Sequence, residues 1–252
     1  LWGLFKKIVI ADRCARYADY IFANYSTLSG SVLLLGAIYF AFQIYGDFSG
    51  YSDIAIGTAK LFGFDIKRNF DYPYFSRDIA EFWRRWHISL STWFRDYVYI
   101  PLGGSYCNKL KRIRNILITF TVSGLWHGAN WTFVFWGFLN GLYYIPVMLL
   151  NKQKNHTGIV AHNSIIPSIK ETSQILGTFF ITLIAWVFFR AETIGHAFSY
   201  LAHMFSISLF TLPPSHREYI IVIIILLVIE WFQRKKEHGF QIEKFPTVLR
   251  WS

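Results

Sequence analysis

The longest uncharged stretch of the chain runs from Asn115 to Asn151, 37 residues without Asp, Glu, Lys or Arg. About 20 consecutive apolar residues in a helix are enough to cross a bilayer. The stretch has room for two helices, which we expect over 113–126 and 130–150, with the polar residues 123–130 between or within them. The chain is 54% hydrophobic and 16% charged, whereas soluble domains carry about 25% charged residues. A membrane protein is therefore predicted.

Further apolar runs repeat this pattern along the chain. Tyr20 to Gly46 is uncharged, and its core, Val32 to Tyr45, is strongly apolar. Thr172 to Phe189 has the minimum length for a span, and Ala197 to Leu212 and Tyr219 to Phe232 are shorter candidates. Lipid offers no partners to backbone polar groups, so long apolar runs of this kind form helices. We expect an all-α, polytopic transmembrane helical bundle.

The net charge of +10 is concentrated beside the apolar runs. Basic clusters next to membrane spans are typical of cytoplasmic loops. The charge therefore indicates the lipid bilayer as the partner of this protein, and we expect no nucleic acid. The clusters are Lys6-Lys7, Lys67-Arg68, Arg84-Arg85, Lys109 to Arg114, and Arg234-Lys235-Lys236.

Residues Ser76 to Asp96 have an amphipathic pattern. Phe82, Trp86, Leu90 and Trp93 recur at helical spacing, which predicts one helical face that lies in the membrane interface or lines a cavity. Asp78 and Glu81 have the spacing of an N-terminal capping pair. The following stretch 99–105 contains a Pro and two Gly, which predicts a turn or re-entrant segment. Residues 151–168 are polar, which predicts an exposed connection.

His127 is an ionisable residue inside the longest uncharged stretch. Ionisable groups within a membrane are expensive and commonly belong to a functional site. A neutral imidazole can take a proton from a hydroxyl and return it to a leaving group. The alternative is a buried His that holds two helices together by hydrogen bonds. Position alone leaves both interpretations open.

His87 follows two Arg residues on the amphipathic segment. From position alone, an interfacial His in an aromatic belt is the better interpretation. If His87 and His127 face one cavity, one is expected to act as base and the other to orient substrate. Neither has a His, Cys or carboxylate at ligand spacing, so we expect no metal and no bound cofactor.

A third group of polar residues spans Tyr45 to Asp53 and contains Asp47, Ser49, Tyr51 and Asp53. Two acids and several hydroxyls around two Gly suit the wall of a polar cavity. They equally suit a loop in which Asp and Ser cap helices. Both interpretations stay open.

Six blocks of the chain follow one another in order within a motif-rich core of about residues 3–140. They are Gly3–Arg13, Gln43–Asp53, Asn69–Phe75, Phe82–Tyr97, Tyr99–Gly104 and Ser123–Trp131. Together these blocks resemble the membrane-bound O-acyltransferase (MBOAT) family, most closely its bacterial alginate O-acetyltransferase-like branch, and the remainder of the chain matches only in pattern.

The resemblance implies helices around a tunnel, with interfacial and re-entrant pieces, in the bacterial inner (plasma) membrane. It implies a catalytic His in Leu125-Trp126-His127-Gly128 and a second His, His87, near the tunnel. The acyl donor is expected to be a cytoplasmic thioester, acetyl-CoA or an acyl carrier protein. Family members are about twice as long, so residues 1–252 are expected to be a single membrane domain, truncated at both ends.

The expected reaction is acyl transfer, most simply O-acetylation of a cell-surface polysaccharide, with His127 as general base. Asn130 or backbone N–H groups near Gly128 are candidate oxyanion donors. The acyl group passes to the polysaccharide or to an extracytoplasmic acetyltransferase partner. The remaining substrate or tunnel residues expected are Trp126, Trp131, Trp86, Asp47, Ser49, Tyr51 and Asp53.

Three other interpretations of the sequence stay open. The chain is alternatively a D-alanyl transferase for teichoic acid, a polytopic transporter or flippase, or a structural membrane subunit in which neither His matters. Transporters usually show paired broken helices in two halves, and no such symmetry is visible.

Overall fold

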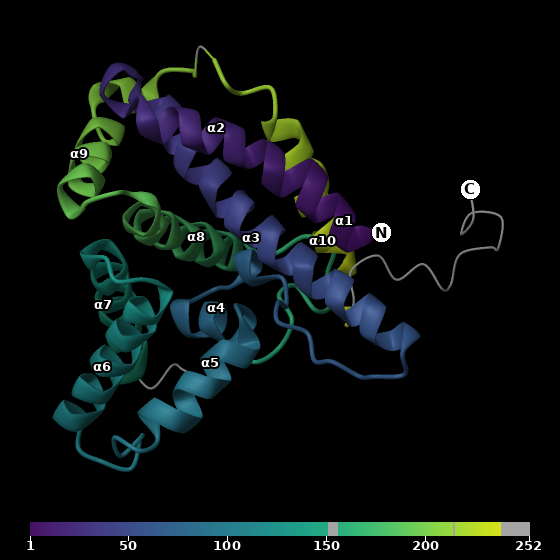
Figure 1. The fold of residues 1–252 in the computed structure, drawn as a ribbon, viewed down its shortest axis with the longest axis vertical. Coiled ribbons are helices and arrows are strands. Elements are labelled where there is room, and N and C mark those ends of the chain that lie inside the picture. Colours follow the sequence, from purple (N-terminus) through teal and green to yellow (C-terminus); the bar gives the residue numbers. More distant parts are fainter. Residues whose placement is uncertain (151–155, 214, 238–252) are drawn as a thin grey trace.

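The computed structural model describes residues 1–150, 156–213 and 215–237, and every regular element in these ranges is a helix. The longest is α3, Gly30–Leu61, which runs diagonally through the molecule (Figure 1). It begins after Ser29 and contains the whole predicted core Val32 to Tyr45. The all-α prediction is confirmed.

The N-terminal segment runs antiparallel to α3. It consists of α1 (Trp2–Leu4), a π-helix over Phe5–Ala11, and α2 (Asp12–Ala23). Small residues allow the close approach, because a Cβ added at Gly3 would lie 2.5 Å from the carbonyl oxygen of Gly50. This contact places the first turns of the chain beside the C-terminal half of α3.

Two helices form a tight hairpin at the left of Figure 1: α6 (Lys109–His127) and α7 (Trp131–Leu149). They match the predicted pair over 113–126 and 130–150. A Cβ at Gly124 would lie 2.1 Å from the carbonyl oxygen of Phe133, and a Cβ at Gly137 would lie 2.2 Å from that of Phe120. The two backbones are therefore in direct contact.

The remaining helices follow the polar connection. A capping box of Ser168 and Glu171 starts α8, Ile169–Arg190, which contains the predicted span 172–189. Next come α9 (Ile194–Met204) and α10 (Ile220–Gln233). The candidate span 197–212 is not one helix, because α9 ends at Met204 and a short 3-10 turn, Ile207–Phe210, follows.

Three of these helices, α3, α7 and α8, are long and apolar enough to cross a membrane. Within the described ranges they pack around a shared aromatic core in which Trp186, Tyr39, Tyr45 and Tyr200 are almost fully buried. The prediction of several membrane-spanning helices is therefore confirmed by the length and composition of these helices.

The prediction of one amphipathic helix over 76–96 is wrong. The segment contains two short helices, α4 (Ile79–Arg85) and α5 (Ile88–Phe94), with a break at Trp86 and His87. Phe82 and Trp86 are buried, whereas Trp93 is 48% exposed, so the predicted face is divided. The capping prediction holds, because the Asp78 carboxylate accepts the backbone N–H of Glu81 at 2.7 Å. A π-helical turn, Arg95–Tyr99, and non-helical turns follow α5.

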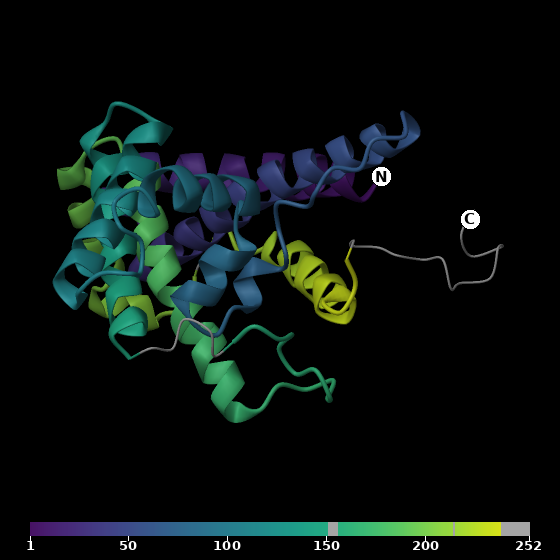
Figure 2. The ribbon, with the colours of Figure 1, turned by 90° about the horizontal axis from the view of Figure 1, so that it is seen from below.

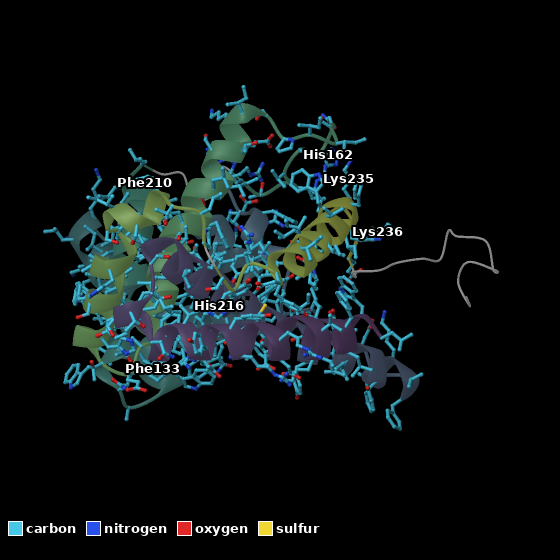
Figure 3. All side chains as sticks on the ribbon, turned by 90° about the horizontal axis from the view of Figure 1, so that it is seen from above. Phe133, His162, Phe210, His216, Lys235 and Lys236 are labelled. Carbon is cyan, nitrogen blue, oxygen red and sulfur yellow. The ribbon has the colours of Figure 1, made fainter. Side chains whose placement is uncertain are left out.

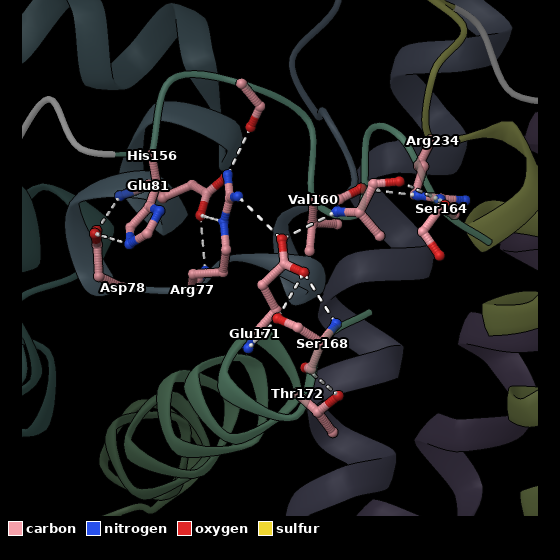
Figure 4. A network of polar contacts seen from close by, with 12 residues as sticks. Arg77, Asp78, Glu81, His156, Val160, Ser164, Ser168, Glu171, Thr172 and Arg234 are labelled. Atoms are coloured by element: carbon pink, nitrogen blue, oxygen red, sulfur yellow. Dashed lines mark hydrogen bonds and ion pairs between the residues drawn. The ribbon is translucent and has the colours of Figure 1, made fainter. Parts of the chain in front are cut away.

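The polar connection between α7 and α8 is held by arginines (Figure 4). Its first residues, 151–155, lie outside the described ranges, and 156–168 are non-helical. Figure 2 shows this loop extending below the bundle beside α10. Glu81 is 1% exposed and accepts hydrogen bonds from Arg77 and Arg85, both at 2.9 Å. These arginines in turn donate to the Gly158 carbonyl oxygen, so a buried carboxylate fixes the loop.

Candidate functional site

His127 is the last residue of α6, and aromatic rings surround its imidazole. Its ring centroid lies 5.0 Å from that of Trp126, 5.3 Å from Trp136 on α7 and 5.1 Å from Phe189 on α8. Trp136 is buried, whereas Trp126 is 59% exposed. Trp136 and Phe189 thus cover the imidazole from inside the bundle, and Trp126 covers it at the edge of the bundle.

The turn after His127 is fixed from both sides. The Asn130 side-chain oxygen caps α7 by accepting the backbone N–H of Thr132 at 3.1 Å. Its amide nitrogen donates to the carbonyl oxygen of Glu192, also at 3.1 Å. Gly128 allows the Phe133 ring to pack closely against the turn, because an added Cβ would lie 2.7 Å from that ring. The local sequence therefore sets the position of the imidazole.

His87 lies in the break between α4 and α5, and its ring packs against Phe48 at 4.5 Å and Phe70 at 6.5 Å. Its Nδ1 is buried and has no hydrogen-bond partner among the described residues. Burial, together with a smaller contribution from the nearby His127, lowers the pKa of His87 to about 4. The structure therefore brings together two histidines that lie forty residues apart in sequence, and His87 is neutral at pH 7.

Three tryptophans link the two histidines. Trp186 on α8 lies 5.1 Å from Trp86 and 5.7 Å from Trp136. Trp86 directly precedes His87, and Trp136 contacts the His127 ring. All three indoles are at least 95% buried. These indoles, which we call the tryptophan wall, make one side of the region between the histidines apolar.

The other predicted site residues on this side are at the edge of the hairpin. Trp131 is 75% exposed, and Asn130 is also exposed. Of the predicted substrate residues, Trp126 contacts the His127 ring and Trp86 directly precedes His87, whereas Asn130 and Trp131 lie at the start of α7.

The polar residues between Asp47 and Asp53 surround Phe48, whose ring packs against that of His87. They lie inside α3, so their interpretation as a capping loop is wrong. Asp53 pairs with the buried Lys6 at 2.6 Å, and Asp47 pairs with Lys7 at 2.6 Å. Ser49 is buried and Tyr51 is 65% exposed. Among the described residues, no hydrogen bond or ion pair joins these four to either histidine.

Of these four residues, Asp53 lines a small cavity at Lys6, and this cavity also reaches Phe70, whose ring packs against that of His87. Ser52 and Asp53 line this cavity together with Tyr45, Tyr72 and Glu230, and the Tyr45 hydroxyl donates to Glu230 at 2.6 Å. Lys6 and Glu230 were not predicted as site residues. Their only sequence signal is a charge in or beside an apolar run.

Within residues 1–150, 156–213 and 215–237, no three His, Cys, Asp or Glu side chains are arranged so that they could hold a metal ion. Cys14 and Cys107 are both free thiols. His127 and His87 each supply an imidazole in an aromatic surrounding.

The sequence matches a family model and several known proteins. The family model described as MBOAT, membrane-bound O-acyltransferase family, matches residues 3–189. The "Probable alginate O-acetylase AlgI" of Azotobacter vinelandii is 43% identical over 215 residues, which cover 85% of this chain and 41% of that protein. The "Peptidoglycan O-acetyltransferase" of Helicobacter pylori is 41% identical over 80% of this chain and 37% of its own length.

The "Teichoic acid D-alanyltransferase" of Streptococcus thermophilus is 40% identical over 43% of this chain and 28% of its own length. The chain thus spans about two fifths of the length of the two O-acetyltransferase relatives.

Proposed function

Because the chain belongs to the membrane-bound O-acyltransferase family, we propose that it carries the catalytic centre of an enzyme that transfers an acyl group from a thioester to a hydroxyl. The observation that supports this most directly is the meeting of His127 and His87 beside the tryptophan wall. The proposal concerns the whole protein, of which this chain is a part.

In the proposed reaction, neutral His127 accepts the proton of the acceptor hydroxyl as its oxygen attacks the thioester carbonyl. The carbon–sulfur bond breaks, the acyl–oxygen bond forms, and the imidazolium returns its proton to the departing thiolate. His87, neutral and with a free Nδ1, orients the reacting groups. The tryptophan wall limits water, which would otherwise hydrolyse the thioester.

The hydrogen bonds around the turn limit which group can donate to the oxyanion. The Gly128 N–H donates to the carbonyl oxygen of Leu125 at 3.2 Å, so it is already engaged. The Asn130 amide uses one hydrogen for Glu192 and keeps its second one. We therefore favour Asn130 over Gly128 as the donor.

The distribution of charge supports a cytoplasmic donor. The basic residues Lys109 to Arg114 begin α6, whereas His127 ends it, about 27 Å away at 1.5 Å per residue. Figure 3 shows His162, Lys235 and Lys236 together at one end of the molecule and Phe133, a neighbour of His127, at the other. By the positive-inside rule, the basic end faces the cytoplasm. The donor then enters from the basic end, and the acceptor meets His127 near the opposite face.

The acyl group we favour is acetyl. The two relatives named as O-acetyltransferases align over 80–85% of this chain, and the D-alanyltransferase aligns over 43%. The acceptor is a hydroxyl of a cell-surface polysaccharide or of an extracytoplasmic partner that passes the acetyl group onward.

The decisive test uses the full-length protein in membranes with a labelled acetyl thioester. His127→Ala should abolish transfer of label to surface polymer while the protein accumulates normally, and His87→Ala should reduce it strongly. His203→Ala, an exposed His on α9, is the matched control and should behave as wild type.

Two outcomes would contradict the proposal. Normal acetylation by the His127→Ala protein would remove the catalytic assignment. Uptake or release of intact thioester without cleavage would indicate a transporter. Chemical analysis of surface polymers from a deletion strain identifies the acyl group and the acceptor.

A further inference from the structure

His87 has an unusual backbone conformation. Its φ is 42° and its ψ is 58°, which is the left-handed region that side-chain-bearing residues rarely adopt. Such conformations persist only where the surrounding structure holds them, and they concentrate at functional sites. The residues that hold His87 are therefore of interest for the proposed reaction.

Asn69 binds the two residues that directly follow His87. Its carbonyl oxygen accepts the N–H of Ile88 at 2.9 Å. Its side-chain oxygen accepts the N–H of Ser89 at 3.1 Å and the Ser89 hydroxyl at 2.6 Å. These three bonds, which we call the Asn69 clamp, fix the start of α5 relative to His87.

The other side of His87 is held by Asp71, two residues after Asn69. The Asp71 N–H donates to the carbonyl oxygen of Arg85 at 3.0 Å, and the Arg85 guanidinium donates to the Asp71 carboxylate at 2.9 Å. Residues 69–71 thus bridge the break between α4 and α5.

Phe70 lies between Asn69 and Asp71 in sequence, and its ring packs against the imidazole of His87. Its ring lies nearly parallel to the His87 ring and 5.1 Å from that of Trp86. Phe48, whose ring also contacts that of Phe70 at 5.3 Å, packs against the imidazole at 4.5 Å, and the buried Nδ1 stays without a partner among the described residues. The free nitrogen is thereby held in one place for a ligand.

We propose that Asn69 is a positioning residue for acyl transfer, because its clamp holds His87 in the left-handed conformation that presents its imidazole beside His127. This inference rests on the function proposed above. Asn69 acts through the backbone after His87 and is assigned no contact with substrate.

The test compares Asn69→Ala with Asn69→Asp and Ser89→Ala in the full-length enzyme. Asn69→Asp keeps the side-chain acceptor, so it should retain most activity. Asn69→Ala should lower kcat by about tenfold to a hundredfold with little change in KM, since a shift of about 1 Å near the chemistry has effects of this size. Asn24→Ala, which removes a side-chain-to-backbone bond at the end of α2, is the matched control and should leave kcat unchanged.

A double variant separates positioning from general structural support. In a His87→Ala background, adding Asn69→Ala should cause no further loss of kcat, because the positioned group is already absent. An additional loss equal to that seen in the wild-type background would overturn the proposal. Should Asn69→Ala fail to fold, Ser89→Ala, which removes one bond of the clamp, takes its place in the same cycle.

Chemical modification tests the clamp without using activity. The rate at which diethylpyrocarbonate modifies His87, followed by mass spectrometry, should rise severalfold in Asn69→Ala and stay unchanged in Asn24→Ala. An unchanged rate in Asn69→Ala would refute the clamp even if the acyltransferase function holds. A raised rate in a protein whose His87→Ala variant is fully active would uphold the clamp and refute the role of His87 in catalysis, and with it the positioning role.

Discussion

Substitution of Gly124 by Ala tests whether the contact between α6 and α7 positions His127. The added Cβ would lie 2.1 Å from the Phe133 carbonyl oxygen, whereas ordinary contacts begin at 3.4 Å. The backbones must therefore separate by about 1.3 Å, because neither atom is at the end of a flexible side chain. His127 is three residues further along the same helix and moves with it.

The magnitude follows from this displacement. Overpacking of a close interface costs about 1–3 kcal/mol of folding free energy. Misplacement of a catalytic group by about 1 Å lowers the rate by about a hundredfold. We therefore expect Gly124→Ala to lose about a hundredfold in activity, which is far more than a loss of about 1–3 kcal/mol in stability would cause in a protein that is still folded.

The assay measures acetyl transfer and the thermal midpoint of the purified full-length protein in detergent. Gly177→Ala on α8 is the control, since a Cβ there meets nothing within 4 Å. It should be active and slightly more stable, because Ala exceeds Gly in helix propensity by about 1 kcal/mol. Wild-type kcat in Gly124→Ala would show that the spacing of α6 and α7 does not position His127.

Three further predictions concern single side chains. His87→Gly should be about 1 kcal/mol more stable than His87→Ala, because Gly adopts positive φ freely, while both variants should lose most of the activity; a lower thermal midpoint in His87→Gly than in His87→Ala would contradict the assigned strain. Glu81→Gln should cost about 3–5 kcal/mol by leaving Arg77 and Arg85 without their buried carboxylate. Burial alone would raise the pKa of Glu81, but hydrogen bonds from Arg77 and the charge of Arg85 lower it on balance. The stability that the Glu81 carboxylate contributes is therefore present at neutral pH and is lost as the pH falls below about 4.5. In an acid unfolding experiment, wild type should lose this contribution in that range, whereas Glu81→Gln lacks it at every pH. Asn130→Ala should cost about 1 kcal/mol through the lost cap of α7 and lower kcat as well, whereas a variant that loses stability alone would rule out Asn130 as oxyanion donor.

The long helices could be predicted because their signal is local. Uncharged apolar runs predicted α7 and α8 to within a few residues and placed His127 at the end of α6. The resemblance of ordered blocks singled out His127 and His87 and identified the family. Position alone had left His127 open between a catalytic and a structural role.

The break at His87 could not be predicted, because its causes are distant in sequence. Helical spacing from Phe82 to Trp93 is consistent with one helix, and no Gly or Pro marks the break. The conformation is held by hydrogen bonds to Asn69, about twenty residues earlier. Similarly, Lys6 and Glu230 lie more than two hundred residues apart, and only the packing of the N-terminal turns and α10 on α3 brings them to one cavity.

The arginines that hold the loop before α8 bind its main chain rather than its side chains. Arg84 donates to the carbonyl oxygen of His156, Arg77 and Arg85 donate to that of Gly158, and Arg234 donates to those of Val160, Ala161 and Ser164. Every residue type has a carbonyl oxygen, so the shape of this loop is encoded outside the loop itself. Its exposed residues, such as His162 and Asn163, are therefore free to diverge during evolution, while the four arginines and the buried Val160 and Ala161 are not. The same property makes positions 162 and 163 suitable for a spectroscopic label.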